Sequence, residues 1–144
     1  MLIFNLYIMN YWLLKTEPDN YSYDDLVKDK KTVWDGVANN AALICIRNTR
    51  KGDKAFIYHT GAERQIVGIA EIVSDPYPDP KADNPKLAVF DIKPLKKLNT
   101  PVTLAQIKAI KKYLEFPLVK EGRKSVVEVP KEYWDDFLKM SGSK

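Results

Sequence analysis

Apolar residues recur along the chain in alternating or continuous runs, and these runs predict its strands. They predict strands over residues 11–15, 33–36, 54–60, 65–73, 87–95 and 125–129. The run over 65–73 is apolar on both faces apart from Glu71, which indicates a central strand. Residues 74–86 contain four prolines, so we expect a surface loop there.

Helices are predicted where apolar residues at helical spacing follow a capping residue. The pattern predicts short helices over residues 22–29, 39–47, 103–114 and 130–138. Ser22 with Asp25, and Thr103 with Gln106, have the spacing of capping boxes, in which each side chain accepts a hydrogen bond from the other residue's backbone N–H. In the third helix we expect the buried stripe to continue as far as Leu114.

The mixture of short strands and helices indicates a single α+β domain. At 144 residues the chain has the size of one domain. We expect residues 9–140 to form four to six mostly antiparallel strands curled into a barrel, with short helices on its rim. Residues 1–8 are apolar but lack the basic start of a signal peptide and the length of a membrane span, so we interpret them as an N-terminal extension or an extra edge strand. A cytoplasmic location without membrane contact follows from this prediction.

The composition limits the chemistry that the chain can perform. One cysteine, Cys45, excludes an internal disulfide, and one histidine, His59, leaves too few ligands for a structural zinc site. A glycine-rich phosphate loop, a serine elbow and a redox Cys-x-x-Cys motif are all absent from the sequence. We therefore predict no catalytic residues, no metal and no cofactor, and we favour a binding role.

The positive charge is concentrated toward the C-terminus. The formal net charge is +4, with 12 basic and 6 acidic residues over 93–144 but 11 basic and 13 acidic residues over 1–92. Lys and Arg on one surface gain affinity for phosphates through the release of counterions. The same distribution is typical of a solvated lysine-rich exterior, so charge alone leaves both interpretations open.

Polar and aromatic residues beside the predicted turns have the group types that hold a single nucleobase. Aromatic faces can stack on a base, amides and hydroxyls can bind its edge, and cations can bind the adjacent phosphates. In that order, the candidates are Trp34 and Tyr58; Asn39, Thr16 and Ser125; and Lys15, Arg123 and Lys124. The structural alternatives are a core aromatic at Trp34 or Tyr58, and hydroxyls that serve only the backbone.

These clusters, in this order, resemble the EVE domain family of the PUA-like superfamily. The matching stretches are residues 11–18, 23–26, 34–37, 51–53, 56–59, 67–73, 77–80, 101–104 and 125–126. The resemblance runs from about Met9 to Phe137 and implies a PUA-like pseudo-barrel that accepts a modified base from DNA or RNA. Nucleic acid or a modified nucleoside is thus the expected partner, while the oligomeric state stays open.

Carried onto this chain, the resemblance implies a specific set of site residues. The base pocket would draw on Lys15, Thr16, Trp34, Asn39, Tyr58, His59 and Ser125, with Arg123 near the entrance. Arg123 and Lys124 are the predicted phosphate-binding residues. One departure from the family pattern is Ala38, where many relatives carry an arginine; another is Leu43, which stands in place of a second arginine. For His59 the alternative is a buried imidazole whose hydrogen bonds are satisfied within the fold.

Two other functions stay open from the sequence. Some PUA-like relatives of the ASCH group resemble amidohydrolases that use a Lys, a Thr and a Glu, and this chain has Lys15, Thr16 and either Glu17 or Glu71. Neighbouring strand residues point to opposite faces, so Lys15 and Thr16 can share a pocket only if the strand turns at Glu17-Pro18. The other possibility is a protein-interaction module that uses residues 1–8 as an edge strand.

Overall fold

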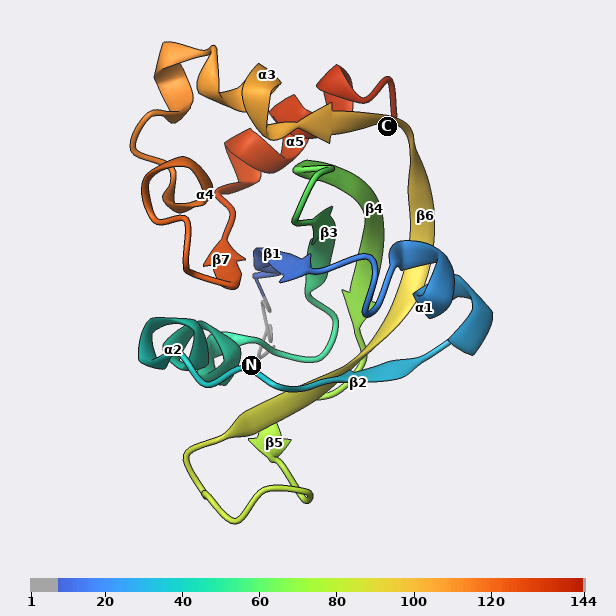
Figure 1. Cartoon of the computed structure of the whole chain (residues 1–144), viewed down its shortest axis with the longest axis vertical. Helices are drawn as coiled ribbons and strands as arrows, with labels where there is room; N and C mark the ends of the chain where they lie inside the picture. The colour runs from blue at the N-terminus through green and yellow to red at the C-terminus, as the bar shows by residue number, and fades with distance from the viewer. Residues whose placement is uncertain (1–7, 144) are drawn as a thin grey trace, which may run out of the picture.

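A strongly curved seven-stranded sheet organises residues 8–143, the part of the chain that the computed structural model describes (Figure 1). The strands are β1 (Tyr11–Thr16), β2 (Thr32–Trp34), β3 (Lys54–His59), β4 (Gln65–Ile72), β5 (Tyr77–Pro78), β6 (Ala88–Thr103) and β7 (Val126–Glu128). They lie in the order β2-β6-β4-β3-β1-β7, and β5 pairs with β6. All pairs are antiparallel except β1 with β3. The predicted α+β fold of mostly antiparallel, curled strands is confirmed, but the sheet has seven strands where four to six were expected. Residues 1–7 of the predicted extension lie outside the described residues.

Short helices surround the sheet. They are α1 (Tyr23–Asp29), α2 (Asn40–Asn48), α3 (Leu104–Lys108), a 3-10 turn (Lys111–Tyr113), α4 (Pro117–Lys120) and α5 (Lys131–Met140). The predicted capping boxes are present at Ser22 and Thr103, and the Asn39 side chain caps α2. These caps satisfy backbone N–H groups that the first helical turn leaves free, which fixes where each helix begins.

Two hydrophobic clusters lie on the two faces of the sheet. The inner cluster packs against α1 and α2 and includes Trp12, Leu14, Tyr23, Leu43, Ile46, Ile57, Phe90 and Trp34. The outer cluster packs against α3, α4 and α5 and includes Leu13, Phe56, Tyr58, Ile107, Phe116, Trp134 and Phe137. Because successive side chains of a strand point to opposite faces, β3 sends Ile57 inward and Phe56 and Tyr58 outward.

The structure differs from the predicted elements at the second half of β6. The strand was expected to end at residue 95, yet it continues to Thr103 through Lys96, Lys97 and Pro101, and its predicted part already contains Pro94. Pro94 pairs with Ala70 where the β4–β6 register shifts. A bulge tolerates a residue that has no N–H to donate, which explains why proline does not end the strand.

The third predicted helix is also shorter than its apolar spacing indicates. It ends at Lys108, and Ile110 takes an extended conformation. Ile110 and Leu114 are exposed, so the predicted apolar stripe of this helix is buried only as far as Ile107. Pro117 then starts α4, which the sequence analysis missed, and Tyr77–Pro78 forms β5 inside the predicted loop.

Candidate functional site

A cavity of about 430 Å³ opens where β1 ends beside β2. Its lining residues are Lys15, Thr16, Glu17, Asn20, Tyr21, Thr32, Val33, Trp34, Asp35, Gly36, Val37 and Ser125. We call it the main cavity. Its volume is within the range of about 300–1,000 Å³ that is common for small-molecule sites. Four of the predicted site residues line it, namely Lys15, Thr16, Trp34 and Ser125.

Trp34 belongs both to the inner cluster and to the cavity wall. It is the last residue of β2, opposite Phe90 of β6, and 8% of its surface is exposed. Gly36 follows with a φ of +76°, a conformation that suits glycine and that redirects the chain directly after the strand. Trp34 is therefore largely buried in the inner cluster while it also lines the main cavity.

Lys15 and Thr16 both line the main cavity, although they are neighbours on β1. The Lys15 ammonium donates to the carbonyl oxygen of Gly122 at 3.0 Å, and burial lowers the pKa of Lys15. The Thr16 hydroxyl donates to the carbonyl oxygen of Tyr21 at 2.7 Å, which draws the following loop back over the strand end. The turn expected at Glu17-Pro18 thus brings both residues to one site.

Tyr21 is the second aromatic residue of the main cavity, and the sequence analysis missed it. Its hydroxyl donates to Asp29 Oδ2 at 2.9 Å, so the loop before α1 is tied to the helix end. Burial is the main cause that raises the pKa of Tyr21, and the bond to Asp29 adds to it. In the sequence, only its aromatic type could have indicated a role at the site, because the position of Tyr21 depends on how the loop folds toward β2.

Two carboxylates, Glu17 and Asp35, also line the main cavity. The Glu17 Oε2 atom accepts a hydrogen bond from the Thr60 hydroxyl at 3.2 Å, which ties Glu17 to the end of β3. Asp35 is exposed and directly follows Trp34. The cavity therefore combines a half-buried cation, two hydrogen-bond acceptors and aromatic rings, a set that can recognise the edge of a planar polar ligand.

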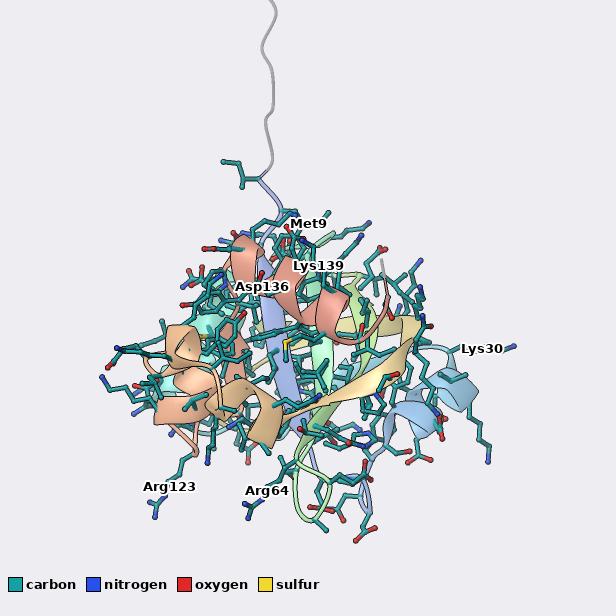
Figure 2. The ribbon with its side chains drawn as sticks, turned by 90° about the horizontal axis from the view of Figure 1, so that it is seen from above. Met9, Lys30, Arg64, Arg123, Asp136 and Lys139 are labelled. Carbon is teal, nitrogen blue, oxygen red and sulfur yellow. The ribbon has the colours of Figure 1, made fainter. Side chains whose placement is uncertain are left out.

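Ser125, Arg123 and Lys124 lie on the segment before β7. Ser125 lines the main cavity, and its carbonyl oxygen accepts from the Lys15 backbone N–H at 2.9 Å. Arg123 is exposed and extends away from the body of the protein (Figure 2). Neither Arg123 nor Lys124 lines the main cavity, so their predicted phosphate contacts would lie outside it.

Tyr58 does not line the main cavity with Trp34, although the family resemblance implied that both belong to one base pocket. It is 3% exposed in the outer cluster, whereas Trp34 is in the inner one. Tyr58 lines a different space of about 290 Å³, together with Lys15, Thr60, Gly61, Arg64, Leu104, Leu118 and Gly122. We call this space the side cavity. The two rings are separated because they project from opposite faces of the curled sheet.

His59 holds α1 against the sheet and does not line the main cavity. Its Nε2 atom accepts from the Tyr23 backbone N–H at 3.0 Å, and its Nδ1 atom lies 2.9 Å from Glu63 Oε1. These partners fit a neutral ring that carries its proton on Nδ1. The bond to Glu63 lowers the pKa of that carboxyl group. His59 therefore matches its structural alternative, a satisfied imidazole.

Asn39 and Glu71 are also placed away from the main cavity. The Asn39 side chain accepts from the Ala42 backbone N–H at 3.0 Å as the cap of α2. Glu71 pairs with Lys54 at the far end of β3, whereas Lys15 pairs with Tyr58 near its other end. The Lys15, Thr16 and Glu71 combination considered for hydrolysis is consequently not assembled, and Glu17 is the glutamate that shares the cavity.

Within the described residues, neither a metal-binding cluster nor a membrane-spanning helix is present. Residues 8–143 contain no cluster of three or more His, Cys, Asp or Glu side chains suited to a metal ion. Within the same range, no helix has the length and apolar character needed to cross a membrane.

Comparison with known proteins places these features in a family context. The EVE domain family model matches residues 10–140. Thymocyte nuclear protein 1 of Rattus norvegicus is 32% identical, over 70% of this chain and 56% of the relative. The Homo sapiens protein of the same name is 30% identical, over 71% of this chain and 57% of the relative. This chain thus spans little more than half the length of these curated relatives.

Solved structures show the same fold. The NMR structure of a Rhodopseudomonas palustris protein has a TM-score of 0.88 at 42% identity and covers 93% of this chain and 94% of its own. The crystal structure of human THYN1 protein in complex with 5-methylcytosine-containing DNA has a TM-score of 0.83 at 26% identity, covering 94% and 99%. An ASCH protein of Zymomonas mobilis has a TM-score of 0.61 at 14% identity, and the match covers 90% of this chain and 94% of that protein. This likeness, which concerns the fold alone, extends to PUA-like folds.

Proposed function

This chain belongs to the EVE domain family, and from that premise we propose that it binds a modified nucleobase of DNA or RNA in the main cavity without catalysing a reaction on it. The supporting observation is that Trp34 lines one cavity together with a cation, Lys15, and two carboxylates, Glu17 and Asp35. A base that leaves the nucleic-acid stack needs an aromatic face to replace its neighbours and polar groups around its edge. The complex of the human relative with 5-methylcytosine-containing DNA supports the same ligand class.

The polar groups favour a base that carries an exocyclic amino group. Carboxylates accept hydrogen bonds from the amino group of cytosine, and Asp35 and Glu17 offer such acceptors at the cavity wall. The Lys15 ammonium can donate to a carbonyl oxygen or ring nitrogen on the same base edge. We therefore take a modified cytosine as the first ligand to test.

Trp34 provides the most direct experiment. We would titrate wild type and Trp34→Leu with two DNA oligonucleotides that differ only in one 5-methylcytosine. Leucine keeps apolar volume in the inner cluster but removes the stacking face, which is worth about 1–3 kcal/mol per base. The expected result is a preference for the modified oligonucleotide in wild type, and a loss of affinity by roughly 10-fold in the variant.

Trp134→Leu is the matched control for this experiment. Trp134 is also a buried tryptophan, but it stacks on Phe56 in the outer cluster, at 3.8 Å between ring centroids. Thermal unfolding of both variants would identify a temperature at which each is folded. If Trp34→Leu kept the wild-type affinity and preference, or if Trp134→Leu lost as much, binding on the indole would be refuted.

A second candidate function is hydrolysis of an N4-acyl cytidine, which Lys15, Thr16 and Glu17 favour because they line one cavity. Water would add to the acyl carbon, the bond to N4 would break, and cytidine and the carboxylic acid would be released. Chromatographic detection of cytidine from N4-acetylcytidine tests this candidate. Turnover that is absent in Lys15→Ala would support it, whereas an unchanged substrate would reject it.

The remaining parts of the proposal rest on the sequence. We propose that residues 9–140 form the binding domain as a single unit, that nucleic acid is the partner and that the chain acts in the cytoplasm. We propose no cofactor for the binding step, since a cavity of aromatic and hydrogen-bonding groups suffices for a base.

A further inference from the structure

The main cavity and the side cavity share one residue, Lys15. Its backbone N–H is fixed to the Ser125 carbonyl at 2.9 Å, and its ammonium reaches the Gly122 carbonyl at 3.0 Å. The side chain thus crosses from β1 to the segment before β7. This placement makes Lys15 the partition between the two spaces.

The charged lining differs between the two cavities. The main cavity contains Glu17 and Asp35 besides Lys15, whereas Lys15 and Arg64 are the charged residues that line the side cavity. Carboxylates suit the amino edge of a base but repel a phosphate at the same distance. The side cavity is consequently the better place for an anion.

Neither cation of the side cavity has an acidic partner within residues 8–143. No carboxylate there lies within 4.0 Å of the Lys15 ammonium or the Arg64 guanidinium, and each bonds a backbone carbonyl instead. An ammonium carries three donors and a guanidinium five, so both keep donors for a ligand. Two cations that flank a cavity without a counter-ion favour an anionic occupant.

The turn between β3 and β4 holds Arg64 at the mouth of the side cavity. Arg64 has a φ of +47°, and its Nε atom donates to the Gly61 carbonyl at 3.3 Å. Its backbone carbonyl accepts from the Leu104 N–H at 2.8 Å, which ties the turn to α3. Arg64 and Arg123 extend on the same side of the molecule, opposite Lys139 (Figure 2).

Resting on the proposed function, we infer that the side cavity holds the sugar-phosphate backbone beside the bound base, with a phosphate between Lys15 and Arg64. A base that enters the main cavity remains attached to the sugar-phosphate backbone of the nucleic acid, and this backbone must run alongside the cavity wall. Because Lys15 lines both cavities, the side cavity lies directly next to the proposed base site, on the other side of this one residue. Leu104 and Leu118 provide an apolar floor for the sugar.

The test compares Arg64→Gln with wild type on single-stranded DNA carrying one 5-methylcytosine and on its unmodified twin. Phosphate contacts carry no base information, so both oligonucleotides should lose affinity by the same factor, roughly threefold to tenfold, and their ratio should not change. The slope of log affinity against log salt concentration should become shallower by about 0.7, the value for one contact on a single strand. Affinity for the free nucleoside 5-methylcytidine should stay the same.

Arg47→Gln is the matched control. Arg47 lines a third cavity with Arg50, Tyr77 and Lys86, which shares no residue with the main cavity. The control should leave both affinities and the salt slope unchanged. An unchanged slope in Arg64→Gln, or an equal change in Arg47→Gln, would overturn the inference. If wild type does not distinguish the twins, the proposed function fails instead, and that outcome is separate from the Arg64 result.

Discussion

The ring of Tyr23 lies so close to Gly68 that a Cβ atom at Gly68 would come within 2.5 Å of Cε2 and Cζ of the ring. Tyr23 is the first residue of α1, and its hydroxyl donates to the Ile69 carbonyl at 2.8 Å. His59 accepts its backbone N–H. The helix therefore sits on β4 at the one position where the strand has no side chain, and the loop that borders the main cavity is fixed with it.

Gly68→Ala should destabilise the fold by about 1–3 kcal/mol, because the added methyl group overpacks a buried contact that the Tyr23 hydroxyl bond holds in place. Denaturant unfolding measures the loss. Gly122→Ala is the control, since a Cβ there has no neighbour within 4 Å and its φ is not positive. An equal decrease in the free energy of unfolding of the two variants would show that the Tyr23 ring moves aside without destabilising the fold.

Asp35→Ala should reduce affinity for the 5-methylcytosine oligonucleotide by roughly 10-fold, because it removes an acceptor for the amino group of the base. Titration of the variant, with its fold checked by circular dichroism, measures this loss. Asp83→Ala removes the same charge from the exposed loop before β6 and should bind like wild type. A loss shared by both variants would indicate a general electrostatic effect rather than contact with the base.

Lys15 should make binding sensitive to alkaline pH. Burial lowers the pKa of Lys15 from 10.5, so its ammonium loses its proton before an exposed lysine does. A phosphate favours the charged form, and affinity should therefore fall as the pH rises through this lowered pKa. Anisotropy titrations would use DNA of adenine and cytosine only, whose bases do not lose protons in this range. Lys15→Gln should bind more weakly and lack the pH step, and a step of equal size in that variant would contradict the assignment.

Tyr77 should contribute to stability that is lost at high pH. Its hydroxyl donates to Asp91 Oδ1 at 2.6 Å, and this bond, with burial adding to it, raises the pKa of Tyr77 to about 12. The folded pKa lies above the unfolded value of 10.0, so the contribution is complete below about pH 10 and declines as the pH rises toward about 12. Free energies of unfolding over this range should fall less steeply for Tyr77→Phe than for wild type. Parallel curves would show that the hydroxyl does not couple to folding.

The sequence predicted the local elements best where a few adjacent residues determine them. Ser22 and Thr103 fix their helix starts through partners three residues away, and both capping boxes are present. The end of β6 depends instead on pairing with β4, which overrides Lys96, Lys97 and Pro101 in its second half. The helical spacing beyond Ile107 had no partner surface to cover, so it did not form a helix.

The site was predictable in residue type but only partly in position. Lys15, Thr16 and Ser125 lie on or beside the neighbouring strands β1 and β7, whereas Trp34 ends β2, which pairs with β6 at the other end of the sheet. The curling of the sheet brings all four residues to one cavity. Tyr58 was assigned to the same space from its aromatic type and the family resemblance. Both faces of β3 are buried, so alternation alone does not say which face borders a cavity. Tyr21 and Asp35 were missed because only the folding of two distant loops brings them together.

The four long strands β1, β3, β4 and β6 each supply side chains to both hydrophobic clusters. Because the same four strands carry both clusters, we expect the two clusters to unfold together. The protein should accordingly melt in one cooperative transition, with amides of these strands exchanging hydrogen only through global opening. Substitutions in α5, which packs on the outer cluster and lines neither cavity, would then change the lifetime of the folded state that binds the ligand.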